Sequence, residues 1–286
     1  MWLLAVLSIL AGMVWGQVEG EGLLRDEVYG RKFGMALTMD VAFPQYEPNG
    51  AAVIVIVSGG WYSWWESEYD KPYEADLYLA NGYTVFWVRH GGAPRFSIEE
   101  GLEDVRRAVR FIRMQASRYG IDPARIGVTG NSAGGHLALM LGLTGDEGTA
   151  EAKRPIDRVS CHVAAVAALV PPTDLSDMAW SSPRVHKRYR KYPGLDISQK
   201  EAARLSPVKV ASADDAPSLF YFAEDDEVVP PAHGDWLSEA LERSGVPHRS
   251  FVFANAKHWP GEENFDRFQG DALAWFNEYL RAESKP

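Results

Sequence analysis

The pentapeptide Gly-Asn-Ser-Ala-Gly at positions 130–134 limits the fold of this 286-residue chain more than any other stretch. It stands between an apolar run at 125–128, typical of a buried strand, and a run at 137–141 that is typical of a helix. A serine between glycines at such a turn takes strained backbone angles that push its hydroxyl outward. Side chains in place of Gly130 and Gly134 would clash with the adjoining strand and helix. Ser132 is therefore the candidate nucleophile, and the helix that follows presents its free N–H groups to the hydroxyl.

Apolar runs and helical patterns alternate along the rest of the chain. Short apolar runs predict strands of a parallel sheet that is buried on both faces, at 51–57, 83–88, 163–170, 218–223 and 249–254. An alternating stretch at 32–43 predicts one or two antiparallel strands at a sheet edge. Helices are expected at about 71–80, 98–119, 235–244 and 264–281. Ser97 and Glu100 form a capping box at the start of the second helix, and Gly120 ends it. This order predicts an open, mostly parallel α/β sheet with helices on both faces.

The first 16 residues contain no charged side chain and resemble a secretory signal peptide. A membrane-spanning helix needs about 20 residues, so this segment is short for one. We expect a secreted or periplasmic protein without stable membrane insertion once the segment is removed, or a membrane-tethered protein if it is retained. A buried N-terminal helix is the alternative. Residues 17–286 are then a single domain, in which the polar, proline-containing stretch 175–210 is a small cap insertion.

The overall composition excludes several classes of function. A net charge of −10 and a pI of about 5.2 argue against general nucleic-acid binding. Cys161 is the only cysteine, so the chain cannot form an intramolecular disulfide. It lies in an apolar run typical of the core. No metal-ligand spacing and no phosphate-binding glycine loop stands out, so neither a metal nor an organic cofactor is expected. Five Lys and Arg residues at 184–191 predict a solvated surface, with a contact to an anionic polysaccharide as the alternative.

A serine hydroxyl needs a base, an acid that orients the base, and donors for an oxyanion. On a fold of this kind the chain order is serine, acid, histidine, each in a loop after a strand. Four carboxylates follow the strand at 218–223 and provide the acid, at 224–227. His258 follows the last strand and is the candidate base. His248 precedes that strand, and His136, inside the helix after Ser132, is expected to pack in the interior.

Backbone N–H groups are the expected oxyanion donors. Ala133 follows the nucleophile, while Gly59 and Gly60 follow the strand at 51–57, where glycine allows the backbone to approach a substrate. The tripeptide His-Gly-Gly at 90–92 is the alternative, but it follows the next strand along the chain. Aromatic residues crowd the stretch 61–73. Among them, Trp61 and Trp64 are candidates for stacking on a sugar ring or an aromatic acyl group, or else for packing onto the core.

Four blocks together resemble α/β-hydrolase serine esterases: S-G-G-W at 58–61, Y-G-I-D-P-A-R-I-G-V-T-G-N-S-A-G-G-H-L-A-L at 119–139, A-E-D-D-E-V-V-P at 223–230 and A-K-H-W at 256–259. The resemblance covers about residues 30–280. It is closest to the branch of bacterial feruloyl and acetylxylan esterases and hormone-sensitive-lipase-like carboxylesterases. It implies an α/β-hydrolase fold with Ser132 as nucleophile, Asp226 as acid and His258 as base. Ser58 departs from this pattern, because it replaces the usual histidine of H-G-G, and Ala223 and Ala256 replace glycines.

The activity that this resemblance implies is hydrolysis of a carboxylic ester through an acyl-enzyme. The substrate would be a small-molecule or polysaccharide-linked ester, with a short acyl or an aromatic group on a carbohydrate. Two other functions stay open. One is hydrolysis of an amide bond by a peptidase or arylformamidase-like enzyme. The other is non-catalytic binding on a hydrolase scaffold, against which the intact order of serine, acid and histidine argues.

Overall fold

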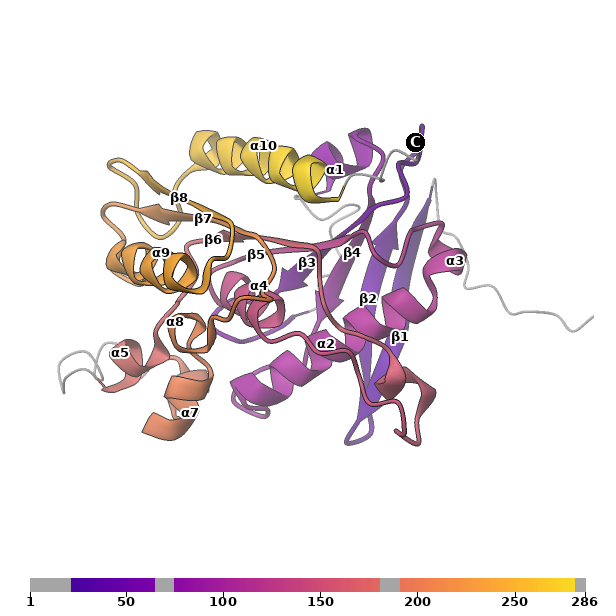
Figure 1. Cartoon of the computed structure of the whole chain (residues 1–286), viewed down its shortest axis with the longest axis horizontal. Coiled ribbons are helices and arrows are strands. Elements are labelled where there is room, and N and C mark those ends of the chain that lie inside the picture. The colour runs from indigo at the N-terminus through magenta and orange to yellow at the C-terminus, as the bar shows by residue number, and fades with distance from the viewer. Residues whose placement is uncertain (1–21, 65–74, 181–190, 281–286) are drawn as a thin grey trace, which may run out of the picture.

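An eight-stranded sheet forms the centre of the computed structural model, which describes residues 22–64, 75–180 and 191–280 (Figure 1). The strand order is β1-β2-β4-β3-β5-β6-β7-β8. Strands β1 and β2 run antiparallel at one edge, and all pairs from β4 to β8 are parallel. The strands are β1 (Leu23–Lys32), β2 (Met35–Ala42), β3 (Ala52–Val57), β4 (Thr84–Arg89), β5 (Ile126–Asn131), β6 (Ala165–Leu169), β7 (Ser218–Ala223) and β8 (His248–Phe253). The predicted mostly parallel sheet with an antiparallel edge is confirmed.

Helices cover both faces of this sheet, as Figure 1 shows. On one face lie α1 (Asp76–Ala80) and α10 (Glu262–Tyr279), and on the other α2 (Ile98–Met114), α4 (Ala133–Leu143) and α9 (Ala232–Ser244). Strand β3 shows why its sequence is apolar throughout. Val53 and Val55 face the α1–α10 layer, while Ile54 and Ile56 face the α2–α4–α9 layer. Two hydrophobic cores, one on each face, follow from this alternation.

Two predicted elements are divided in the structure. The alternating stretch 32–43 contains the turn between β1 and β2, where Phe33 and Gly34 take positive φ angles of 45° and 78°. The predicted helix 98–119 breaks at Gln115 into α2 and α3 (Ala116–Tyr119). The Ser97–Glu100 capping box is present, and Gly120 ends α3 in the left-handed conformation. Local sequence signals therefore located both helix termini, whereas the break itself has no glycine or proline to mark it.

The predicted cap stretch 175–210 contains more regular structure than its composition suggests. Its described residues form α5 (Leu175–Trp180), the 3₁₀ helix η2 (Pro193–Leu195), α7 (Gln199–Arg204) and α8 (Pro207–Val210). Another 3₁₀ helix, η1 (Pro155–Arg158), precedes β6. Ser198 and Glu201 form a second capping box at the start of α7, a signal that was present in the sequence. The segment 1–16 and most of the basic run 184–191 lie outside the described residues, as do the first residues of the helix predicted at 71–80.

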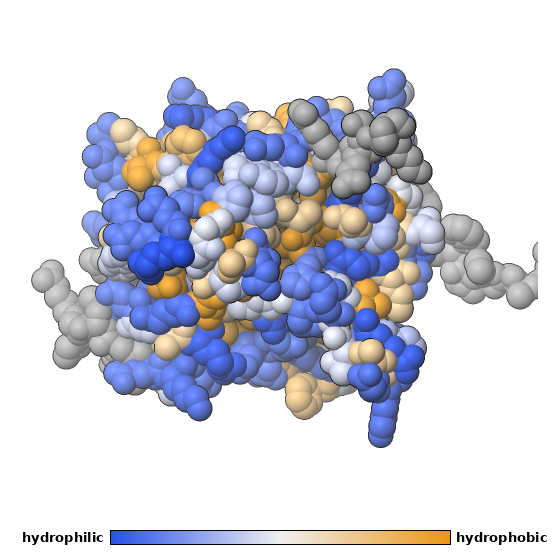
Figure 2. Space-filling view, in the orientation of Figure 1, coloured by the Kyte–Doolittle hydropathy of each residue, from blue (hydrophilic) through white to orange (hydrophobic). Residues whose placement is uncertain are grey.

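Hydrophilic side chains cover most of the face shown in Figure 2, and hydrophobic ones show between them in scattered places. This agrees with a chain in which both layers of helices turn their apolar sides to the sheet. In the described part of the chain, no helix combines the length and the apolar character that crossing a membrane would require.

Candidate active site

Ser132 lies in the turn between β5 and α4, with φ 50° and ψ −119°. Its N–H donates to the Leu169 carbonyl at 2.8 Å, which ties the turn to the neighbouring strand β6. A Cβ atom on Gly130 would lie 2.6 Å from the carbonyl carbon of Gly134, and one on Gly134 would lie 2.6 Å from the Ile56 carbonyl oxygen. Both distances are impossible for a real side chain. The structural reason predicted for these two glycines is therefore confirmed.

The structure brings the three predicted catalytic side chains into one chain of hydrogen bonds. His258, in the loop after β8, places Nε2 at 2.9 Å from the Ser132 hydroxyl oxygen. Its Nδ1 lies 2.7 Å from Oδ2 of Asp226, in the loop after β7. The Asp226 side chain is completely buried, whereas that of His258 is 29% exposed. The arrangement leaves part of the imidazole open to solvent and keeps water from the carboxylate.

Asp226 is held in place by backbone donors as well as by the histidine. Its Oδ1 accepts hydrogen bonds from the N–H groups of Val228 at 2.7 Å and Val229 at 2.9 Å. Glu224 points elsewhere and accepts from the Asn255 N–H at 2.9 Å, and Asp225 is exposed. Of the four consecutive carboxylates, Asp226 is thus the one that contacts His258, as the sequence resemblance implied.

The loop after β3 lies against the turn that carries Ser132. The Gly134 N–H donates to the Ser58 carbonyl at 3.2 Å, and Gly59 forms a two-residue bridge with Tyr62. In that bridge the Gly59 N–H donates to the Tyr62 carbonyl at 3.0 Å, so it is not free to receive an oxyanion. The prediction for Gly59 is wrong in this respect. Among the described residues, the backbone N–H groups of Gly60, Trp61 and Ala133 have no hydrogen-bond partner.

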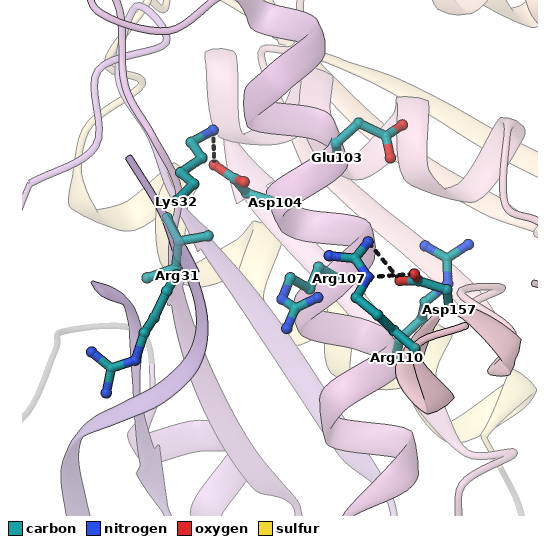
Figure 3. Close-up of a pocket in the computed structure, with 9 residues that line it drawn as sticks. Arg31, Lys32, Glu103, Asp104, Arg107, Arg110 and Asp157 are labelled. Carbon is teal, nitrogen blue, oxygen red and sulfur yellow. Dashed lines mark hydrogen bonds and ion pairs between the residues drawn. The ribbon is translucent and has the colours of Figure 1, made fainter. Parts of the chain in front are cut away.

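The alternative His-Gly-Gly loop at 90–92 is fastened to a different part of the fold. The Gly91 N–H donates to Asp104 Oδ2 at 2.8 Å, and the same oxygen pairs with Lys32 Nζ at 2.6 Å. Figure 3 shows Lys32 reaching from β1 toward Asp104 on α2, at the upper end of a polar pocket. This pocket lies beside β1 and α2, and ion pairs occupy much of its wall. The Gly91 N–H is therefore occupied, and the 58–61 loop remains the expected source of oxyanion donors.

A shallow depression lies beside the Ser132 hydroxyl. Its walls are mostly apolar and come from the loop after β3, the turn at Ser132, α5 and the loop after β7. The lining residues are Gly60, Trp61, Ser132, Ala133, Pro172, Met178, Tyr192, Val228 and Val229. Met178 and Tyr192 belong to the predicted cap stretch, which therefore contributes to the wall.

The two candidate aromatic residues differ in their exposure. Trp61 is 3% exposed, and its indole meets the His136 ring edge to face. Burial favours the alternative of packing onto the core, although Trp61 also lines the depression beside Ser132. Trp64 is 45% exposed, and its ring covers the position that a Cβ on Gly59 would occupy, at 3.2 Å. The other aromatic residues of that cluster beyond residue 64 lie outside the described ranges.

Two other histidines near the site are buried and structural. His136 Nδ1 accepts from the Trp61 indole N–H at 3.1 Å, and its Nε2 lies 2.8 Å from the Leu205 carbonyl oxygen. His233 Nδ1 accepts from the backbone N–H of Thr173 at 3.1 Å. Burial lowers the pKa of each of these imidazoles to about 4. Both rings are therefore neutral at pH 7, and the packing role expected for His136 is confirmed. Within the described ranges, no three His, Cys, Asp or Glu side chains are grouped so as to hold a metal ion.

A parallel sheet covered by helices, with a serine in a strained strand-to-helix turn, is the α/β-hydrolase fold. Residues 39–241 match the protein-family model described as BD-FAE, so the chain belongs to this family of α/β-hydrolase esterases.

The solved structures with the same fold include several esterases. An acetyl ester-xyloside bifunctional hydrolase from Caldicellulosiruptor lactoaceticus is 26% identical, with a TM-score of 0.71 over 84% of this chain and 88% of that one. A truncated carbohydrate esterase from gut microbiota has a TM-score of 0.74 at 22% identity, over 93% of this chain and 99% of that one.

The curated relatives are longer than this chain, and the matches cover only part of them. Esterase LipQ of Mycobacterium tuberculosis is 29% identical over 188 residues, which is 62% of this chain and 42% of that protein. Endo-1,4-beta-xylanase B of Butyrivibrio fibrisolvens is 27% identical over 172 residues, or 60% of this chain and 26% of that protein. The chain thus spans less than half the length of these relatives.

Proposed function

We propose that this protein hydrolyses carboxylic esters through an acyl-enzyme formed on Ser132. The observation that carries the proposal is the unbroken series from Ser132 Oγ to His258 Nε2 at 2.9 Å and from His258 Nδ1 to Asp226 at 2.7 Å. Both distances are within the range over which a base can take a proton. Membership of an esterase family supports the same activity.

In the first half of the reaction, His258 Nε2 takes the hydroxyl proton as Ser132 Oγ attacks the ester carbonyl carbon. Asp226 holds the Nδ1 proton and stabilises the imidazolium that forms. The carbonyl oxygen becomes an oxyanion, which the N–H groups of Ala133, Gly60 and Trp61 receive. One such donor is worth about 10²–10³ in rate. His258 then returns its proton to the leaving alcohol, which breaks the carbon–oxygen bond and leaves the acyl group on Ser132.

In the second half, a water molecule gives a proton to His258 and attacks the acyl-enzyme. The same donors receive the second oxyanion, and His258 protonates Ser132 as the acid leaves. Every proton moves through one imidazole, so these steps need neither a metal nor an organic cofactor. The exposed edge of His258 is consistent with access of water to the acyl-enzyme.

The shallow depression beside Ser132 favours a small acyl group. Met178, Val228 and Val229 supply apolar contacts of the kind that suit a short alkyl chain. Carbohydrate esterases among the structural neighbours support a sugar alcohol as the other half of the ester. We therefore propose short acyl esters of carbohydrates as substrates, with aromatic acyl esters as the second choice.

A series of p-nitrophenyl esters of increasing acyl length tests this proposal. We expect turnover that is highest for the shortest chains and absent in Ser132→Ala, and labelling of Ser132 by a fluorophosphonate. Ser250→Ala, at an exposed position on β8, is the matched control and should behave as the wild type. A wild-type protein that neither turns over any ester nor reacts with the fluorophosphonate would contradict the proposal and favour a binding function.

An amide substrate is the second candidate. Acylamino-acid-releasing enzymes of rice and Arabidopsis are among the relatives, at 24% and 29% identity. A formyl-aryl amide and an acylamino-acid anilide, assayed beside the esters, separate the two activities. Labelling of Ser132 without ester turnover, together with amide turnover, would assign the protein to this second class.

A further inference from the structure

The loop that carries the oxyanion donors has a strained backbone. Gly60 and Trp61 take successive positive φ angles of 57° and 62°. Glycine adopts such an angle freely, but a bulky residue such as tryptophan does so at a cost of about 1 kcal/mol or more. The loop keeps this conformation only if its surroundings hold it there. The buried hydroxyl of Ser58, where the family usually has a histidine, has no hydrogen-bond partner in the described structure and gives no such support.

The Trp61 side chain connects this loop to the helix that follows the nucleophile. Its indole N–H donates to His136 Nδ1 at 3.1 Å, and the two rings meet edge to face with centroids 5.5 Å apart. His136 lies in the first turn of α4, and its own N–H donates to the Ser132 carbonyl at 2.9 Å. The indole–imidazole bond therefore joins the loop of Gly60 directly to the backbone of Ser132.

The hydrogen-bond partners of His136 determine which of its ring nitrogens carries the hydrogen. An indole N–H can only donate, so Nδ1 must be the unprotonated acceptor. Nε2 then carries the hydrogen and donates to the Leu205 carbonyl at 2.8 Å, between α7 and α8. One neutral imidazole thus links three segments: the loop after β3, the start of α4, and the stretch 199–210. The first two of these segments line the depression beside Ser132.

We propose that Trp61 and His136 are positioning residues, whose hydrogen bond holds the strained loop so that its free N–H groups face the developing oxyanion. The inference rests on the proposed ester hydrolysis. The indole N–H of Trp61 and the imidazole of His136 are hydrogen-bonded to each other and act on the reaction only through the loop that they hold. Their effect is on the transition state, because the oxyanion forms only there.

Trp61→Phe tests the bond by removing the N–H donor while keeping an aromatic ring in the interior. We expect kcat on a short p-nitrophenyl ester to fall at least about tenfold, with KM changed less than about twofold, as for loss of an interaction made in the transition state. Trp275→Phe is the matched control. Trp275 is 1% exposed on α10, its indole N–H has no partner in the described structure, and it lies on the opposite face of the sheet. This control should lower the melting temperature without changing kcat.

Two substitutions of His136 separate its two hydrogen bonds. In His136→Asn the amide oxygen takes the place of Nδ1 and can still accept from Trp61. In His136→Gln the amide nitrogen takes the place of Nε2 and can still donate to Leu205. We expect the kcat of the Gln variant to fall as in Trp61→Phe. The Asn variant should keep most of the wild-type kcat. The double variant Trp61→Phe/His136→Gln should be no slower than either single one, because both remove the same bond.

The outcomes distinguish this inference from the proposed function. Ester turnover that persists in Trp61→Phe with an unchanged kcat would overturn the inference and leave the esterase intact. Equal losses in the Asn and Gln variants would also overturn it, because they would indicate a packing role for His136. A wild-type protein without turnover or fluorophosphonate labelling would instead contradict the proposed function, on which the inference rests.

Discussion

At the scale of single residues, Asp226 depends on its backbone neighbours for its position. The two N–H groups of Val228 and Val229 hold one carboxylate oxygen, and His258 occupies the other. Both oxygens of this buried carboxylate thus have hydrogen-bond partners. The neighbouring Asp225 is exposed and contacts none of these atoms through its side chain.

These two adjacent aspartates provide a matched pair of variants. Asp226→Asn keeps the shape of the side chain but removes the charge that holds the His258 proton, so kcat should fall by about 10⁴-fold. Asp225→Asn should change kcat less than about twofold. Steady-state kinetics on a short p-nitrophenyl ester measure both. A large loss of kcat in the Asp225 variant alone would show that Asp225, and not Asp226, is the acid.

The single cysteine gives a second prediction at this scale. Cys161 is fully buried, and burial raises the pKa of its thiol. The thiolate is the reactive form, so we expect no reaction with Ellman's reagent in the native state and one thiol per chain after unfolding in urea. Rapid reaction of the native protein would show that the region around Cys161 opens without global unfolding.

At the scale of elements, the sequence predicted what depends on local signals. Ser97 with Glu100 located the start of α2, and the apolar run 218–223 coincides with β7. The division at Gln115, which no glycine or proline marks, was not predicted. Helix α7 was also missed, although the Ser198–Glu201 capping box is a local signal for its start. The bridge that occupies the Gly59 N–H was not predictable either, since the glycine alone does not indicate the partner.

The turn between β5 and α4 gives a prediction for an element. Gly130→Ala places a Cβ atom 2.6 Å from backbone atoms of Gly134, which cannot move away without disturbing α4. We expect a loss of about 2–3 kcal/mol in the free energy of unfolding, together with most of the activity. Gly270→Ala is the control in an exposed position of α10 with free space around it, and should raise stability by about 0.5–1 kcal/mol. Urea unfolding followed by circular dichroism measures both, and equal stability of the two variants would contradict the steric reason.

At the scale of the whole molecule, the sheet brings distant residues together. The loops with Ser132, Asp226 and His258 follow the parallel strands β5, β7 and β8, so all three lie at the same edge of the sheet. This is why chain order could predict Ser132, His258 and the loop of the acid, whereas the choice of Asp226 among four carboxylates came from the resemblance to the esterase family. The contact of Trp61 with His136 joins the loop after β3 to α4 through two side chains. No sequence pattern indicated this contact, although His136 was expected to pack in the interior.

The two buried histidines predict how stability depends on pH. His136 and His233 have pKa values of about 4 when folded, against 6.5 for an unperturbed histidine. Between these values the unfolded chain binds the protons and the native protein does not. Stability therefore falls as pH is lowered from about 6.5 toward 4, by up to about 1.4 kcal/mol per pH unit for each histidine. The contribution of the two groups to the pH dependence fades above pH 6.5, as the histidines of the unfolded chain also lose their protons.

Urea unfolding between pH 7 and 4.5 measures this slope. His233→Asn and His136→Asn replace each imidazole by a group that does not titrate and still offers an acceptor at the Nδ1 position. Each variant should have a flatter slope than the wild type in this range, while the carboxylates contribute equally to both. Parallel slopes in variants and wild type would mean that these imidazoles are protonated in the native protein.

The neutral state of the His136 imidazole has one more consequence, which concerns dissolved ions. Salt weakens attraction between exposed charges but has little to screen in a buried bond between two uncharged rings. Exposed ion pairs such as that of Arg249 with Glu278 loosen as salt is added, whereas the link between Trp61 and His136 does not. The loop beside Ser132 should thus keep its conformation from low to high ionic strength.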